Sequence, residues 1–198
     1  MATTERTLTG LVTIAALAIG VAVTSRLPSA DSIAAQPFVH QASIGETVSL
    51  RTGQVTVDGV DATTAVKQSG TTVKTSAHWL LVTMRFTAAR EPSALAGTTL
   101  KAADGRTYSA TRPLQSTCGT GQPGITIRCT IPFEVPADAL AGAHLLVPAA
   151  LLGQGAGDDL ADVDLGISTT RAAELAAITE PKTVTGVTVV GAQAGGGS

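Results

Sequence analysis

The sequence predicts an all-β sandwich preceded by one N-terminal transmembrane helix. Three observations lead to this fold class: an uncharged apolar segment near the N-terminus, a series of short stretches with two-residue alternation, and two cysteines on either side of a turn. With 198 residues, 44% of them hydrophobic, the chain is long enough for one globular domain and an anchor.

The N-terminal segment, residues 1–27, is predicted to be a membrane anchor. No charged residue lies between Arg6 and Arg26, and the apolar side chains of residues 7–25 would surround a helix on all sides. At 1.5 Å per residue this helix would be about 28 Å long, close to the thickness of a bilayer core. Two alternatives remain open: a signal peptide that is cleaved, for example after Ala34, and a helix buried in a protein core.

Residues 28–43 are predicted to form a spacer between the anchor and the domain. They contain Pro28 and Pro37 and show neither helical nor strand periodicity. After Gly45 the pattern changes to short apolar stretches separated by turn residues. We therefore expect the β-sandwich to span residues 44–168.

Two of the expected strands show the strongest alternation. Residues 79–87 place apolar side chains on one face throughout, and residues 125–135 alternate apolar and polar side chains along their whole length, with Cys129 on the apolar face. Pro132 lacks the N–H that a ladder needs, so its strand is expected to lie at a sheet edge or to bulge there. Weaker patterns predict further strands at residues 47–51, 54–57, 71–75, 143–147 and 163–167.

The two cysteines, Cys118 and Cys129, are predicted to form a disulfide. Pro123-Gly124 between them is a strong turn signal, so the chain can double back and bring the two sulfurs together. Such a ring would contribute roughly 2–3 kcal/mol, and it would form in an oxidising compartment. Arg6 and Arg26 flank the anchor on both sides, so charge does not indicate which end is cytoplasmic. The orientation follows instead from the disulfide, which requires the domain to lie outside the cytoplasm. We expect a single-pass cell-membrane protein with a cytoplasmic N-terminus and an extracytoplasmic domain.

The tail, residues 169–194, has a mixed pattern. Residues 171–178 could form two helical turns, which Pro181 would end, and residues 183–190 are β-prone and could add a strand to this domain or to a partner. The last four residues, 195–198, read Gly-Gly-Gly-Ser and look like an artificial linker.

Four sequence stretches together resemble a known family. They are IGETVSLRTGQVTVDGV (44–60), HWLLVTMRFTA (78–88), LKAADGRTYSA (100–110) and IPFEVPADALAGAHLLV (131–147). In this order they are similar to the telokin-like, immunoglobulin-fold family of uncharacterised bacterial extracytoplasmic domains. The resemblance implies an immunoglobulin-like sandwich outside the cytoplasm and no enzymatic activity. Members are often lipoproteins, whereas this chain has no cysteine near its N-terminal segment.

The residue types required for catalysis are scarce. The chain has three histidines, His40, His78 and His144, and no spacing pairs any of them with a nucleophile. Ser43 lacks the sequence context of a nucleophile elbow. No basic stripe interleaved with aromatic residues is present, which argues against nucleic-acid binding. The sequence predicts no cofactor and no catalytic residue.

One acidic cluster could hold a cation. It is formed by Asp158, Asp159, Asp162 and Asp164, and four carboxylates so close together could hold calcium, which takes six to eight oxygen ligands. A solvated acidic loop is the simpler interpretation, because the cluster lacks the glycine and terminal glutamate of an EF-hand loop.

Trp79 and Tyr108 are the two aromatic side chains that could form an interface, with core packing as the alternative. We therefore expect a non-catalytic binding or accessory module, a subunit or partner of a larger membrane or cell-envelope complex. A secreted or anchored hydrolase and a calcium-binding envelope protein are the alternatives.

Overall fold

The computed structural model describes most of the chain after residue 36, namely residues 37–95, 97–110, 114, 117–148, 150–151 and 159–192. The expected anchor (residues 1–27), Asp158 and the four C-terminal residues 195–198 lie outside the described residues. Within the described part, no helix is both long and apolar enough to cross a membrane.

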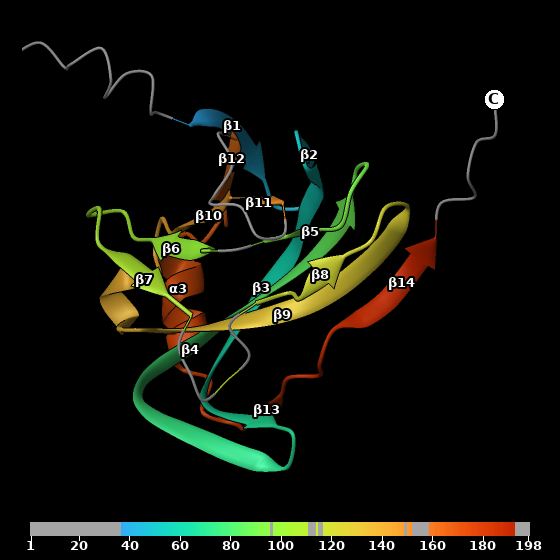
Figure 1. Ribbon diagram of the computed structural model, residues 1–198. Helices are drawn as coiled ribbons and strands as arrows, with labels where there is room; N and C mark the ends of the chain where they lie inside the picture. Colours follow the sequence, from blue (N-terminus) through green and yellow to red (C-terminus); the bar gives the residue numbers. More distant parts are fainter. Residues whose placement is uncertain are drawn as a thin grey trace, which may run out of the picture. The chain divides into compact units, whose positions relative to one another are not determined.

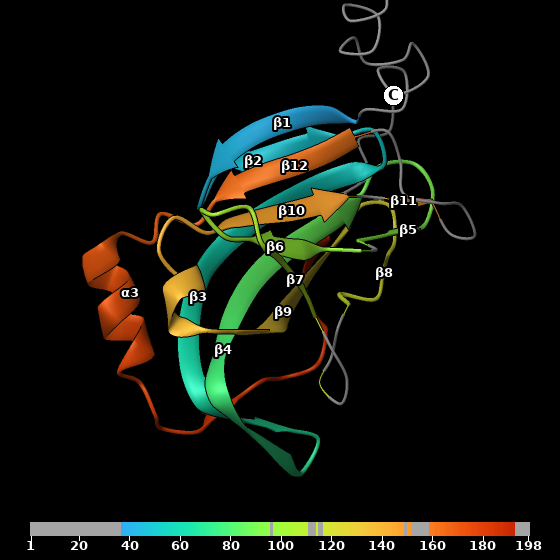
Figure 2. The same cartoon turned by 90° about the vertical axis from the view of Figure 1, so that its left-hand side faces the viewer.

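The described residues form a β-sandwich, and its first sheet, sheet A, has the strand order β1-β12-β10-β6-β7 (Figures 1 and 2). Strands β1 and β12 run parallel to each other, and the other neighbours are antiparallel. Because β1 and β12 are far apart in the sequence, their pairing joins the beginning of the domain to its last third. The strands are β1 (Phe38–Ser43), β6 (Thr99–Lys101), β7 (Thr107–Ser109), β10 (His144–Pro148) and β12 (Asp159–Asp164).

The second sheet, sheet B, has the order β13-β3-β4-β9-β14, with β2 paired to the first residues of β3 and β13 to its last residues. The two longest strands, β3 and β4, form a hairpin whose turn is made by Ser69 and Gly70, both with positive φ. The strands are β2 (Thr47–Leu50), β3 (Gly53–Gln68), β4 (Thr71–Ala88), β9 (Ile125–Val135), β13 (Lys182–Thr183) and β14 (Thr188–Ala192).

Smaller elements complete the domain. A three-stranded sheet has the order β11-β5-β8, and two short helices, η1 and α3, lie next to each other. The helix α3 begins where the Ser168 hydroxyl accepts a hydrogen bond from the Arg171 N–H, and it buries Leu175. The remaining bounds are β5 (Ser93–Ala94), β8 (Thr120–Gly121), β11 (Ala150–Leu151), η1 (Ala137–Ala139) and α3 (Thr169–Ala176).

The main hydrophobic core lies between sheets A and B. Both sheets contribute inward-facing residues to one cluster, among them Leu145 and Val163 from sheet A and Val82 and Phe133 from sheet B. The two strongest sequence patterns account for this. Strand β9 has the bounds predicted for residues 125–135, and its apolar face is the buried one. The predicted strand at 79–87 is the second half of β4.

Pro132 occupies a sheet edge, as its missing N–H requires. Strand β14 pairs with β9 only over residues 125–128, so the half of β9 that contains Pro132 has β4 as its partner and no strand on the other side among the described residues. The prediction of an edge position is confirmed.

Two segments differ from the sequence interpretation. The second part of the expected spacer, residues 28–43, is strand β1, which pairs with β12 over its full length. Its side chains are mostly exposed on both faces, so the sequence shows no alternation of apolar and polar residues. The segment is a strand because it pairs with the distant strand β12. The acidic segment is also a strand and not a loop: β12 buries Ala161 and Val163, while Asp164 is exposed.

The C-terminal tail is part of the domain, and residues 179–192 are called the strap below. Strand β13 pairs with β3 on one side of sheet B, and β14 pairs with β9 on the other side, so residues 184–187 pass across the sheet between them. Val184 of the strap packs with Trp79 and Leu81 in a second hydrophobic cluster, on the side of β4 that faces away from the main core.

Phe86 of β4 is held in a slot between two glycines. A Cβ atom on Gly121 would lie 2.7 Å from Phe86 Cε1, and one on Gly53 would lie 2.7 Å from Phe86 Cε2. Phe86 is only 1% exposed, so its ring has no free space into which it could move.

We expect Gly121→Ala to destabilise the domain by about 2 kcal/mol, because the added methyl group overpacks the Phe86 slot. The free energy of unfolding is measured by urea titration. Gly59→Ala is the matched control, since a Cβ there meets nothing within 4 Å and should change stability by less than about 0.5 kcal/mol. Equal stability of the two variants would contradict the slot.

Candidate functional site

Two histidines of sheet A are paired with aspartates of β12. His144 Nδ1 lies 2.7 Å from Asp162 Oδ1, and His40 Nε2 lies 3.4 Å from Asp159 Oδ1. Both pairs join neighbouring strands, because β12 lies between β1 and β10. The third histidine, His78, is half-buried on β4, next to Trp79 and away from both pairs.

The acidic residues of β12 are engaged by the protein itself. Asp159 accepts a hydrogen bond from the Arg51 N–H at 2.6 Å, Asp162 contacts His144, and Asp164 accepts from the Gly166 N–H at 2.8 Å. Among the described residues, no group of three or more histidine, cysteine or acidic side chains is arranged to hold a metal ion. The calcium interpretation thus finds no ligand set in the described part of the cluster.

A shallow depression of about 330 Å³ lies over β1, β10 and β12 and brings Ser43 near His144 and Asp162. Ser43 is exposed, and its backbone N–H donates to Glu46 Oε2 at 2.7 Å. The hydrogen bonds of the described residues do not join the Ser43 hydroxyl to the His144 ring, so the geometry does not form a nucleophile–base pair.

Cys118 and Cys129 form the expected disulfide. Their Cα atoms are 5.3 Å apart, and both residues are buried, with Cys129 on the core side of β9. The disulfide attaches the segment before β8, which contains Cys118, to strand β9 of sheet B, which contains Cys129. Because β8 contributes Gly121 to the Phe86 slot, the disulfide also helps to hold this slot in place.

The two aromatic residues considered for an interface lie in different environments. Trp79 is 2% exposed and packs in the second hydrophobic cluster. It is therefore a core residue, which was the alternative to an interface residue. Tyr108 is half-buried, packs against the main core and has the Arg106 guanidinium 6.0 Å from the centre of its ring.

Arg106 is itself held by two carboxylates. Its Nε lies 2.5 Å from Asp104, and its Nη2 lies 2.8 Å from Asp138. The backbone N–H of Arg106 donates to Asp104, and this hydrogen bond together with the guanidinium lowers the pKa of Asp104 below its ordinary value. The hydrogen bonds to Asp138 and Asp104 raise the pKa of Arg106.

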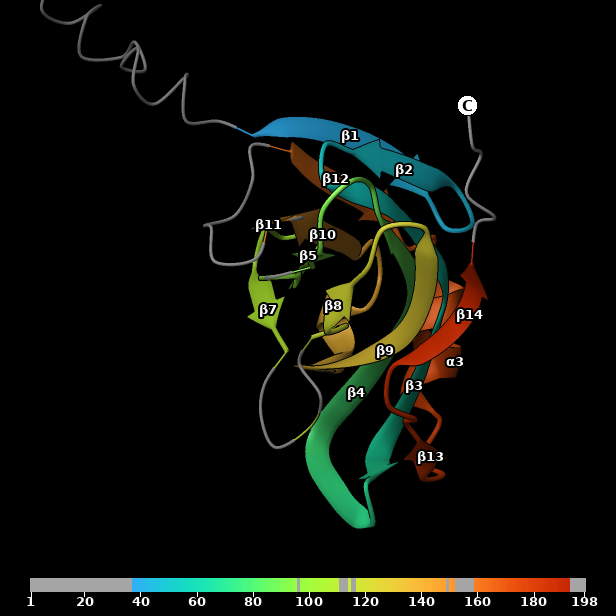
Figure 3. The same ribbon diagram turned by 45° about the vertical axis from the view of Figure 1, so that its right-hand side comes forward.

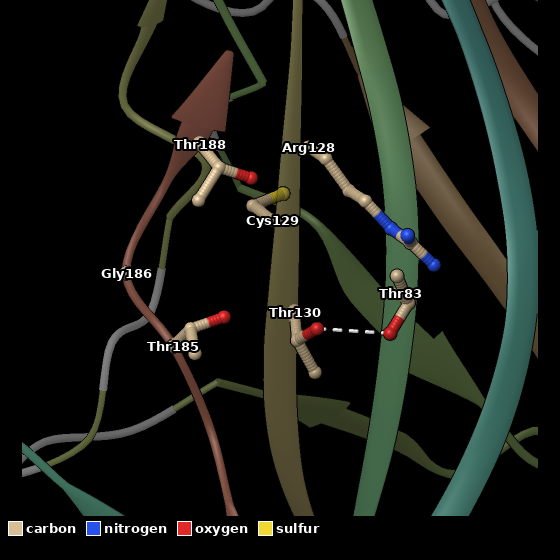
Figure 4. A pocket seen from close by; sticks show the side chains of 7 residues that line it. All are labelled: Thr83, Arg128, Cys129, Thr130, Thr185, Gly186 and Thr188. Carbon is tan, nitrogen blue, oxygen red and sulfur yellow. Dashed lines mark hydrogen bonds between the residues drawn. The ribbon is translucent and has the colours of Figure 1, made fainter. Parts of the chain in front are cut away.

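The outer face of sheet B carries a polar pocket of about 200 Å³ beside the strap (Figure 4). Sequence reasoning missed this pocket, because its residues come from β4, β9 and the strap. It is lined by four threonines with Arg128, Cys129 and Gly186, the threonines being Thr83, Thr130, Thr185 and Thr188.

A charged cluster lies next to this pocket. Asp58 of β3 accepts a hydrogen bond from Arg85 Nε at 2.7 Å and forms an ion pair with Arg128 Nε at 3.5 Å. Two arginines therefore share one carboxylate, and the cluster has a formal excess of one positive charge.

The margin of sheet B beyond β9 is formed by β14 (Figure 3). This strand contains no charged residue and exposes large apolar side chains: Val189 is 68% exposed and Val190 is 48% exposed. Strand β1, at the margin of sheet A, exposes Phe38 and Val39 in the same way.

Comparisons with known proteins give a similarity of fold alone. No model of a known protein family matches the sequence, and no functionally curated protein is detectably similar to it. The yjhA protein from Bacillus subtilis is similar in structure, with 18% identity, a TM-score of 0.45, and coverage of 62% of this chain and 99% of that chain. An uncharacterised β-sandwich protein from Clostridium difficile has 10% identity, a TM-score of 0.42, and coverage of 66% and 96%, respectively. These similarities do not extend to a function.

We expect Val184→Asp to release the strap from sheet B, because an unpaired charge buried against Trp79 costs about 3 kcal/mol or more. Trp79 is the one tryptophan of the chain, so its fluorescence reports directly on this contact. Its emission should shift to longer wavelength and become accessible to acrylamide. Val187→Asp is the control, since Val187 is already 41% exposed. Unchanged emission in the Val184 variant would show that the strap does not cover Trp79.

Proposed function

We propose that this protein is a membrane-anchored, non-catalytic binding module that acts as an accessory subunit of a larger membrane or cell-envelope complex. The observation that carries the proposal is the free edge of β14. This strand ends sheet B and exposes Val189 and Val190, so a further strand could pair with it and cover these valines. The partner that we propose is an extended segment of another protein, added to sheet B alongside β14.

The backbone of β14 supports this mode of binding. On one side it pairs with β9, and on the other side no described strand uses its N–H and C=O groups. Natural proteins protect such margins with charged residues, proline or β-bulges. The sequence of β14, Thr-Val-Val-Gly-Ala, has no charged residue and no proline, and its ladder with β9 shifts register between Val189 and Gly191. A partner strand would satisfy these backbone groups and cover the exposed valines.

The chemistry of β14 favours an uncharged partner segment. Val189 and Val190 are both exposed, so an apolar β-branched strand could pack against them. A strongly charged segment would find no opposite charge on β14 itself. Self-association of two β14 strands is the competing outcome, and the oligomeric state of the purified protein distinguishes it.

The proposed location follows from the sequence and the disulfide. We propose that residues 7–25 span the cell membrane once, that the N-terminus is cytoplasmic and that the sandwich lies outside. The Cys118–Cys129 bond supports an oxidising compartment. We further propose that the domain is immunoglobulin-like and related to the telokin-like family, which the four sequence stretches of residues 44–147 support.

We expect the full chain to fractionate with membranes and to resist extraction by alkaline carbonate. Leu17→Arg, in the middle of the predicted span, should lower this retention, because it adds about 2.5–3.5 kcal/mol to the cost of insertion. Ala30→Arg, outside the span, is the control and should be retained as the natural sequence is. Recovery of a soluble protein that begins at residue 35 would show that the N-terminal segment is a cleaved signal peptide and not an anchor.

We expect Val189→Lys to remove the protein from its native complex, because the lysine would place an unpaired charge in the β14 interface. The complex is extracted from native membranes in mild detergent and sized by gel filtration, and its partner is identified and then reconstituted from purified components. Amides of residues 188–192 should gain protection from hydrogen exchange when the partner binds.

The matched control is Val39→Lys, which alters an exposed valine at the margin of sheet A, 52% exposed against 68% for Val189. It should leave the complex intact. Loss of the complex in the Val39 variant alone would place the partner on β1. Elution of the natural protein as a monomer from every extraction would contradict an accessory subunit.

A further inference from the structure

A row of apolar side chains crosses three strands on the outer face of sheet A. Val39 of β1 pairs in register with Leu160 of β12, and Leu160 pairs in register with Pro148 of β10, so the three side chains share one face. This is the outer face, because Ala161, which follows Leu160 in β12, belongs to the main core. Phe38 precedes Val39 at the start of β1. Phe38 and the three residues of the row are called the apolar row below.

The apolar row is not covered by the described part of the domain. None of its residues belongs to either hydrophobic cluster of the described residues. Phe38 is 64% exposed and Val39 is 52% exposed, and the side chains from β12 and β10 are half-buried. The register partner of Phe38 is Asp159, whose carboxylate accepts a hydrogen bond from the Arg51 N–H and is only 13% exposed. This end of sheet A therefore presents apolar surface with little exposed negative charge beside it.

The row lies on the face of the sheet as well as at its edge, and this limits what can cover it. Leu160 and Pro148 belong to the second and third strands of sheet A (Figure 2). A strand added beside β1 would satisfy the free backbone groups of β1 but would leave these two side chains uncovered. A broad apolar surface, such as a lipid bilayer, can contact the whole row at once.

The place of the row in the chain brings it close to a bilayer. Twelve residues, 26–37, separate Phe38 from the predicted span at residues 7–25. A chain of this length extends to at most about 40 Å, and a random chain of this length spans about 20 Å. A tether this short gives an effective concentration on the order of millimolar, so even a weak apolar contact with the bilayer would be well populated.

We propose that the apolar row docks on the outer leaflet of the membrane that residues 7–25 span, with Phe38 and Val39 inserted among the lipid headgroups. This proposal rests on the anchor proposed above and not on the partner strand at β14. Docking would also orient the domain. The turn of the β3–β4 hairpin lies at the opposite end of the domain from β1 in all three ribbon views, so it would point away from the bilayer (Figures 1–3).

The test places a tryptophan in the row and measures its contact with lipid. The full-length Phe38→Trp variant is reconstituted in liposomes of phosphatidylcholine with brominated acyl chains, which quench tryptophan on contact. Its quenching should be several-fold larger than that of the natural sequence, whose one tryptophan, Trp79, is 2% exposed. Thr72→Trp, at an exposed position beside the hairpin turn, is the control and should add no quenching.

A second substitution separates docking from nearness to the membrane. Val39→Asp, added to Phe38→Trp, should reduce the quenching several-fold, because a carboxylate is costly to bury in an apolar environment. Gln41→Asp, added instead, alters a polar residue two positions further along the same face of β1 and should leave the quenching unchanged. Undiminished quenching in the Val39→Asp variant overturns the proposal, since the short tether alone would then explain it.

Flotation of the liposomes separates this proposal from the anchor. Protein that floats with the liposomes but shows no quenching at residue 38 overturns the docking of the apolar row and leaves the anchor intact. Protein that does not float overturns both. Equal quenching at residues 38 and 72 also overturns the proposal, because the domain would then have no preferred orientation. Val189→Lys should leave the quenching unchanged, so failure of the partner strand does not decide this proposal.

Discussion

Strand β4 buries apolar side chains on both of its faces, and the rest of the domain is arranged around this constraint. One face places Leu80 and alternate residues onward to Phe86 in the core between the two sheets. The other face carries Trp79 and Leu81, which water would otherwise reach, and a second layer must cover them. The strap supplies part of that layer through Val184. The C-terminal tail therefore helps to keep water from the outer face of the hairpin of β3 and β4.

The strap is held by contacts at several points along sheet B. The Thr63 hydroxyl donates to the carbonyl of Glu180, Lys182 forms an ion pair with Asp61, and the Val184 N–H donates to the Lys67 carbonyl. Each of these contacts joins residues more than a hundred positions apart in the sequence. A chain that ended before the strap would lose the Val184 contact with Trp79 and would leave β9 without a partner on the side away from β4 at residues 125–128.

The sequence predicted the elements whose side chains alternate between a buried and an exposed face. Strand β9 and the disulfide at Cys129 follow from that alternation and from the Pro123-Gly124 turn. Strand β1 escaped prediction because its exposed side chains carry no pattern, and the burial of Trp79 depends on a distant segment. The pocket joins β4 and β9 with the strap, so its arrangement requires the pairing of β4 with β9 and the placement of a distant segment beside them. The outward placement of Arg85 and Arg128 was nevertheless visible in the alternation of their strands.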